Sequence, residues 1–248
     1  MNGISLRGLP QFLTFLTTYP EPQQVVSSLR TGVLSSVGAR TTTLWSLTDG
    51  DLVMVAQDGH TREEADRYSV LPGNLDLLMW RAIRSGSPLI TGENDAVMSN
   101  FSSVDEESWS RTLTRVEAVS VVRAPLMHCG QPVGALGLLS DQVWNSDAAA
   151  LLEVVTSMLG LWLTSPDSGA REAAKANRTR ATSFRLAFTD RQKEVLRMVE
   201  QDASTPQIAI TLNQSESTIK QDLQQVMRAL NTRNRAIAAA RARELGLI

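Results

Sequence analysis

A run of polar side chains between positions 217 and 228 has the composition and spacing of a surface that reads nucleic acid. Helical spacing places these residues on one side of a helix, opposite an apolar stripe. Lysine pairs with phosphate or guanine, and the glutamine amide suits adenine in the major groove. The predicted base-reading face consists of Ser217, Lys220, Gln221, Gln224, Gln225 and Arg228.

Three helix starts frame this face. Thr189 and Ser204 each carry a hydroxyl with a glutamine three residues later, which is the arrangement of a capping box. Ser215 caps a third helix that holds Glu216 in its first turn. Only residues 212–214 separate the second helix from the third, and the asparagine among them tolerates the left-handed conformation of a tight turn. Two short helices, a tight turn and a longer helix predict a DNA-reading unit.

Apolar residues offer these helices a common core. They recur at helical spacing in each segment, so three stripes can close on one another. The stripes are Val195, Leu196 and Val199, then Ile208 and Leu212, then Ile219, Leu223, Val226 and Leu230.

The segment from Phe188 to Arg235 carries, without gaps, a series of residues that resembles the LuxR-type helix-turn-helix of bacterial transcription factors. The series is Glu194, Val195, Leu196, Ile208, Ala209, Leu212, Ser215, Thr218, Ile219, Lys220, Leu223, Leu230, Arg233, Asn234 and Arg235. The resemblance implies a recognition helix in the major groove and a fourth helix, from Arg233 to Leu245, that pairs two protomers. Double-stranded DNA and a second copy of the chain are thus the expected partners.

The resemblance also assigns roles along the recognition helix. It implies that base edges are contacted by Lys220, Gln221 and Gln224. It places near the phosphate backbone the residues Thr218, Arg228, Arg233 and Arg235.

Four positions depart from the family pattern. Asp202 replaces a glycine, Gln207 a glutamate, Gln214 a half-buried aliphatic residue and Asp222 a common histidine. An acidic side chain near phosphates weakens the electrostatic part of DNA binding. We therefore expect lower affinity rather than loss of the fold. The alternative is a protein-binding adaptor whose degenerate helix-turn-helix serves only dimerisation.

Charge divides the chain into two unlike parts. Residues 166–248 hold 14 Lys and Arg against 9 Asp and Glu, whereas residues 1–165 hold 10 against 17. A basic C-terminal part attracts nucleic acid and an acidic N-terminal part is repelled by it. The single cysteine, Cys129, and the two histidines predict neither a disulfide nor a zinc centre, and no cofactor is expected.

The chain is expected to be a soluble cytoplasmic protein. Its first ten residues lack the charged start and the apolar core of a signal peptide. The most apolar stretch, from Ala148 to Leu163, contains polar interruptions and is expected to be too short for a bilayer. Pro166 and Gly169 stand in a turn-rich break, and the small, basic residues after it cannot bury a core. The predicted organisation is a first domain over residues 1–165, a linker over 166–184 and a helix-turn-helix domain over 185–248.

The first domain is predicted to be α+β, an antiparallel sheet with flanking helices. Two stretches, Arg81–Leu89 and Val119–Leu138, resemble the "helix–G–x–P" and "strand–PL–turn–G–x–L–x–L" segments of GAF domains. The resemblance implies a module that senses a small molecule or a signal, but no cyclic-nucleotide or bilin motif is visible. The alternative is an acyl-homoserine-lactone-binding domain, whose aromatic and aspartate pattern is not apparent.

Three residues are candidates for a ligand site in that domain. GAF relatives bind between the sheet and the crossover helices, where Trp80 and Trp109 would form a roof or simply pack in the core. Arg123 lies in a predicted strand and is either an interior cation for an anionic ligand or a charge on the sheet surface.

The helix from Ser146 to Leu163 has more than one apolar face. One face can cover the sheet, and the other is expected to pair with the same helix of a second protomer unless it too is buried within one domain. The candidate interface residues are Leu151, Leu152, Val155, Leu159 and Trp162.

These patterns predict a dimeric regulator whose first domain senses a small molecule or partner and whose second domain reads DNA. A signal that favours one dimer arrangement would shift the spacing between recognition helices. An enzyme is not expected, because no Ser–His–Asp constellation, glycine-rich phosphate loop or metal-ligand cluster emerges.

Overall fold

The chain divides into two compact units, residues 1–179 and residues 180–248, each of which is described by itself. The structure is a computed structural model that describes residues 8–73, 77–92, 106–185, 188–230, 232, 234–244 and 248.

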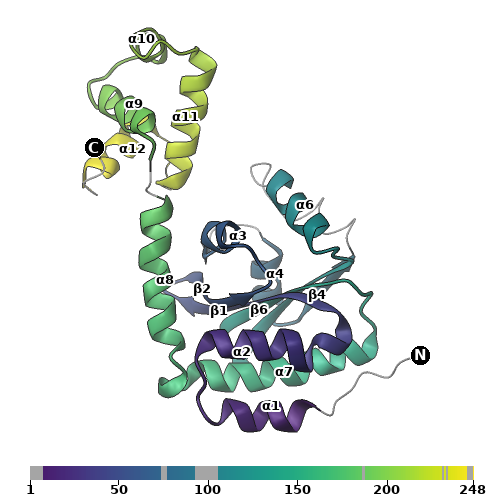
Figure 1. The fold of residues 1–248 in the computed structure, drawn as a ribbon. Helices are drawn as coiled ribbons and strands as arrows, with labels where there is room; N and C mark the ends of the chain where they lie inside the picture. The colour runs from purple at the N-terminus through teal and green to yellow at the C-terminus, as the bar shows by residue number, and fades with distance from the viewer. Residues whose placement is uncertain are drawn as a thin grey trace. The chain divides into compact units, whose positions relative to one another are not determined.

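An antiparallel sheet organises the first unit (Figure 1). The described strands follow the order β3-β2-β1-β6-β5-β4, and each neighbouring pair runs antiparallel. The strands are β1 (Ala39–Thr48), β2 (Asp51–Asp58), β3 (Val70–Leu71), β4 (Leu89–Gly92), β5 (Ser120–His128) and β6 (Gln131–Ser140). The predicted α+β class, with helices flanking an antiparallel sheet, is confirmed.

Helices cover both faces of this sheet. On one face α2 contacts β1 and β2, α7 contacts β5 and β6, and α1 packs on α7 (Figure 1). On the other face lie α3, α4 and α6. The helices are α1 (Leu9–Leu16), α2 (Pro22–Ser28), α3 (Arg62–Arg67), α4 (Leu78–Ser85), α6 (Glu106–Arg115) and α7 (Ser146–Thr164), with a π-helical turn at Leu29–Val33.

Helix α7 is long and apolar because it is the main cover of the sheet. Among the described residues it is the one helix long and apolar enough to cross a membrane, which corrects the expectation that this stretch is too short. Half of the apolar stretch of this helix is nevertheless buried within the chain. At Gly160 the helix comes so near β5 that an added Cβ would lie 2.3 Å from the Met127 carbonyl oxygen. The helix therefore contacts the sheet backbone to backbone, as the core helix of a globular domain does.

Three elements of the first unit go beyond the order expected from the sequence. They are α1, a second helix before the β1–β2 hairpin, and α3 and β3, which follow that hairpin. A capping box starts α3, because the Thr61 hydroxyl accepts from the Glu64 amide and the Glu64 carboxylate accepts from the Thr61 amide. That signature was present in the sequence, but the helix is short and lies between segments with stronger strand patterns.

The expected linker is also mostly regular structure. After a 3₁₀ turn at Pro166–Ser168, residues 170–185 form helix α8 (Ala170–Arg185). The boundary between the two compact units falls inside this helix, after Thr179, rather than at the start of the segment.

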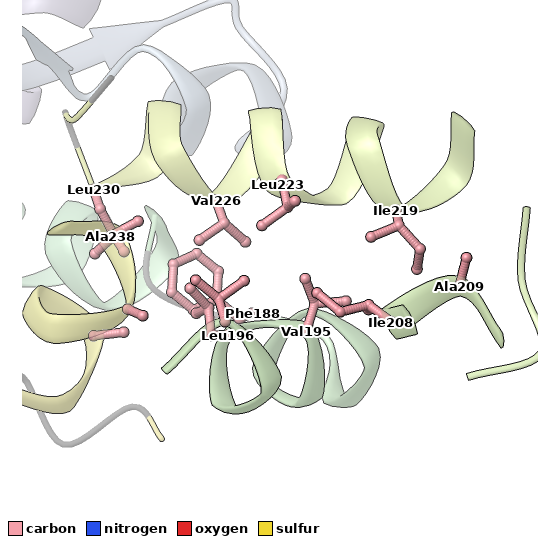
Figure 2. Packing of buried hydrophobic residues seen from close by; sticks show 13 residues of the cluster. Phe188, Val195, Leu196, Ile208, Ala209, Ile219, Leu223, Val226, Leu230 and Ala238 are labelled. Carbon is pink, nitrogen blue, oxygen red and sulfur yellow. The ribbon is translucent and has the colours of Figure 1, made fainter. Parts of the chain in front are cut away.

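The second unit is all-α, as predicted. Its helices are α9 (Asp190–Glu200), α10 (Thr205–Thr211), α11 (Glu216–Ala229) and α12 (Arg235–Glu244). Ile219, Leu223 and Val226 of α11 point toward α9 and α10, where they meet Val195 and Ile208 (Figure 2). All five are buried, so the three predicted stripes do close on one core.

The three predicted helix starts of this unit are confirmed. The hydroxyls of Thr189, Ser204 and Ser215 each accept a hydrogen bond from the backbone N–H three residues later. Asn213 has the expected left-handed conformation, with φ of +52°. Asp202, which replaces the family's usual glycine, is also left-handed, with φ of +60°. Aspartate is among the few side chains that tolerate this region, so the turn survives the replacement.

Candidate nucleic-acid interface and sensor face

The outer side of α11 carries the polar residues that the sequence predicted. All six are exposed while the apolar stripe behind them is buried: Ser217, Lys220, Gln221, Gln224, Gln225 and Arg228. The Lys220 side chain is 64% exposed, and its ammonium lies 3.8 Å from the Glu216 carboxylate one turn earlier. An exposed ion pair of this kind is weak and screened by salt. The Lys220 ammonium is therefore available to a phosphate or a base.

The remaining predicted DNA contacts lie at the ends of α11 and α12. Thr218 is half-buried, and its hydroxyl lies 2.8 Å from that of Ser215, so it belongs to the helix cap as well. Arg228 is in the last turn of α11 and is exposed. Arg235 begins α12 and is half-buried, and Arg233 lies outside the described residues.

Asp222 does not lie on the outer face. Its side chain is only 4% exposed and points to α9, where it accepts hydrogen bonds from Arg191 Nε at 2.7 Å and Arg191 Nη2 at 3.1 Å. The hydrogen bond and the charge of Asp222 raise the pKa of Arg191. The expectation that Asp222 weakens phosphate binding is corrected, because its charge is neutralised inside the unit.

A second polar contact reinforces this arrangement. Gln192 Nε2 of α9 donates to Gln225 Oε1 of α11 at 2.8 Å. Gln225, although exposed, is thus held by α9 and is less available to bases than Gln221 or Gln224. The two contacts between α9 and α11 fix the rotation of α11 about its own axis.

Arg123 lies on the face of the sheet that α4 and α6 cover. It pairs across the sheet with Gly137, where an added Cβ would lie 2.8 Å from the Trp45 ring and 3.2 Å from Met79 of α4. The half-buried guanidinium donates to the carbonyls of Val122 at 3.0 Å and Leu138 at 3.3 Å. Burial lowers the pKa of Arg123 to about 10, so the side chain is still a cation at neutral pH. This placement fits the interpretation of Arg123 as an interior cation better than its interpretation as a charge on the sheet surface.

An apolar cluster under α4 includes Trp45 and Met79, which lie at Gly137, the cross-strand partner of Arg123. Trp45, Trp80, Met54 and Met79 are each at most 6% exposed, so Trp80 is a core residue at this point. In the described part of the chain neither indole N–H, of Trp45 or of Trp80, has a hydrogen-bond acceptor. Buried donors without acceptors are costly and uncommon. The two indole N–H groups are therefore polar sites inside a cluster that is otherwise apolar.

Helix α6 is held over the same face by a half-buried carboxylate. Glu64 of α3 accepts hydrogen bonds from Thr112 Oγ1 and Arg115 Nη2 of α6, both at 2.7 Å. Burial acts to raise the pKa of Glu64, but hydrogen bonds from His60, Thr61, Thr112 and Arg115 together hold it below its usual range. Trp109 belongs to α6, but its side chain lies outside the described residues.

The residues expected at a dimer interface are core residues of a single chain. Each is at most 4% exposed: Leu151, Leu152, Val155, Leu159 and Trp162. This corrects their assignment, because these side chains are buried within a single chain and do not lie on the exposed side of α7. The apolar residues that α7 does expose are Val154, at 41%, and Leu161, at 63%, seven residues apart and so on one side of the helix.

Comparison with protein-family models finds two matches. Residues 21–163 match the GAF domain, and residues 186–242 match bacterial regulatory proteins of the luxR family. No curated protein sequence matches the chain significantly.

Solved structures similar to the chain include several described as GAF domains. The GAF domain from a phosphoenolpyruvate-protein phosphotransferase of Coxiella burnetii is 16% identical, with a TM-score of 0.49, over 69% of this chain and 95% of that one. The corresponding domain from Acinetobacter is 14% identical, with a TM-score of 0.49, over 72% and 99%. The A. aeolicus nlh2 GAF domain, solved in an inactive state, is 13% identical, with a TM-score of 0.48, over 62% and 92%.

We predict that Asp222→Asn destabilises the second unit. The substitution keeps the shape of the side chain but removes the charge that holds Arg191, and we expect the melting temperature of this unit to fall by about 5 °C or more. Calorimetry of the full chain would resolve this transition. Glu194→Gln is the control, because its ion pair with Arg197 is exposed at both ends and should matter less. Equal effects of the two variants would contradict the assignment.

Proposed function

Because the chain belongs to the GAF family and ends in a domain of the luxR family of bacterial regulatory proteins, we propose that it is a dimeric, sequence-specific transcriptional regulator. The single observation that carries the proposal is the outer face of α11. That face presents Lys220, Gln221 and Gln224 to solvent while the opposite side of the helix is locked into its own unit. The proposal assigns the chain no catalytic turnover and a cytoplasmic location.

The chemistry of this face suits the major groove. An α-helix fits that groove, and glutamine and lysine recognise the base edges displayed there. The exposed Arg228 can contact phosphates at the far end of α11. The inward orientation of Asp222 removes one of the two departures that favoured a degenerate domain, and the other, Gln214, is exposed.

The sensor face proposed for the first unit lies between the sheet and helices α4 and α6. Its supporting observation is Arg123, a half-buried cation beside the Trp45–Trp80 cluster. A small organic anion with an apolar body would match the guanidinium and the unpaired indole donors at once. We propose this class of effector for the unit.

Dimer formation is proposed through the exposed side of α7. Val154 and Leu161 form an apolar stripe there, and α1, which contacts α7, exposes Leu13 at 47%. A symmetric pair of such helices would bury these side chains against their own copies. Two protomers would add the binding energies of two DNA half-sites.

We predict that Lys220→Ala weakens DNA binding and that Gln224→Ala alters sequence preference. The full-length chain would first select sites from a library of random duplexes, and the enriched duplex would be titrated at fixed salt. Loss of a lysine contact should weaken binding about tenfold, whereas Gln224→Ala should lower discrimination more than affinity for random duplex. Lys175→Ala, which removes the same charge from α8, is the control. A wild-type chain that enriches no site would support the adaptor alternative.

We predict that Leu161→Glu converts a dimer into a monomer. A charge at the centre of an apolar helix pair would have to be buried without a partner. Sedimentation velocity of the full chain measures the outcome. Val143→Glu is the control, because Val143 is 80% exposed but precedes the helix. A wild-type monomer, or a Leu161→Glu dimer, would refute this interface.

We predict that Arg123→Leu abolishes stabilisation by small organic anions. A compound that binds only the folded state raises the melting temperature, so carboxylates and phosphates with apolar bodies would be screened by thermal shift against the wild-type chain. Each variant is compared with its own melting temperature in buffer. Arg62→Leu serves as the control, because Arg62 is 87% exposed on α3. Equal stabilisation of the wild type and Arg123→Leu, or none of the wild type, would refute the proposed anion site.

A further inference from the structure

The first half of α8 is fixed to the sheet instead of serving as a loose connection. Ala170 and Ala174 are 2% and 3% exposed, and Asn177 and Arg178 follow on the same side of the helix. Both polar side chains make contacts with the β1–β2 hairpin, more than 120 positions earlier in the chain. Immediately after these residues, at Thr179, the first compact unit ends.

Arg178 binds the turn of the hairpin. Its Nη2 donates to the Thr48 carbonyl oxygen at 2.5 Å. Its guanidinium nitrogens also lie 3.6 Å from the carboxylates of Asp49 and Asp51, on either side of the turn. One cation therefore joins the helix to a carbonyl and two acids of a single β-turn.

Asn177 binds the second strand of the hairpin at its irregular point. Its side-chain amide donates to the Met54 carbonyl at 2.8 Å and lies 3.5 Å from that of Val55. The β1–β2 register places Leu44 opposite Ala56 and Trp45 opposite Met54, so Val55 is the extra residue of a β-bulge. On its other edge β2 pairs with β3 at Leu52 and Val53, and the Met54 amide donates to the Ser69 carbonyl at 2.8 Å. Asn177 thus binds carbonyl groups of β2 at and next to the bulged residue.

Met54 connects this contact to the sensor face. Its carbonyl is bound by Asn177, and its side chain packs in the apolar cluster with Trp45 and Trp80. A change in the packing of that cluster would move the segment of β2 to which Asn177 of α8 is hydrogen-bonded. Conversely, a displacement of α8 would alter the bulge opposite Trp45.

We infer that Asn177 and Arg178 form a latch between the sensor unit and the helix that leads into the DNA-binding unit, and that opening this latch changes DNA binding. The inference rests on the proposed function. Polar contacts at a half-exposed helix surface are the kind that open and close while the cores of both units stay folded. A closed latch restricts how α8 leaves the first unit, and an open latch adds the freedom of about two helical turns. In a dimer this freedom changes the fit to two half-sites at once.

The test compares Arg178→Gln and Asn177→Asp with Arg171→Gln in the full-length chain. Arg171→Gln removes the same charge from the same helix, at an exposed residue with no ion pair in the described part of the chain. Hydrogen exchange followed by mass spectrometry should show faster exchange of α8 in the two latch variants and not in the control. Circular dichroism confirms that each variant is folded. Asp51→Asn, which weakens the latch from the hairpin side, should also speed exchange.

The same variants are then titrated with the duplex enriched by the wild-type chain. We expect a change in affinity of at least threefold for the two-half-site duplex, and none for a duplex that keeps one half-site. Unchanged exchange would show that no latch forms, and faster exchange with unchanged affinity would show that the latch does not act on DNA binding. Either result overturns the inference. If the wild-type chain enriches no duplex, both the proposed function and the regulatory role of the latch are refuted. The exchange data then show whether the latch itself forms.

Discussion

Helix α11 can present a polar side to a partner only because contacts on its other side prevent the helix from rotating about its own axis. Its apolar stripe is inserted among α9, α10 and α12, and Asp222 adds a charged contact to Arg191 that would be lost on rotation. Successive residues of a helix differ in direction by about 100°. A rotation that brought Lys220 to the present place of Ile219 would therefore bury the lysine ammonium in the core. The orientation of the base-reading residues follows from this core and not from contacts of their own.

The first unit is organised by a different constraint, namely that its sheet must be covered on both faces. Helices α2 and α7 cover one face with close packing, down to a contact between Gly160 and the β5 backbone. On the other face, α3, α4 and α6 enclose a mixture of aromatic and charged groups, among them Trp45, Trp80 and Arg123. Buried donors and a desolvated cation stabilise a fold less well than apolar packing does. Their concentration on one face distinguishes that face from the closely packed face under α2 and α7.

The chemistry of α8 relates the two units. Its sequence is small and basic and cannot form a core, yet it folds as a helix whose first part lies on an acidic hairpin. The charge of the chain changes at this point, because the residues before the helix are net acidic and the helix itself is strongly basic. The contacts that hold the first part of α8 to this hairpin are polar.

The amino-acid sequence by itself determined what depends on neighbours a few residues away. The capping boxes at Thr189 and Ser204, the turn at Asn213 and the stripes of the C-terminal helices were all predictable, because such signals act within one or two turns. Only the tertiary structure decided which side of α7 is exposed and where Asp222 points. Those outcomes depend on partners far away in the chain: the sheet for α7, Arg191 for Asp222 and the β1–β2 hairpin for α8. A single sequence carries no sign of such pairings, because each side chain is compatible with several partners until the fold brings one of them within reach.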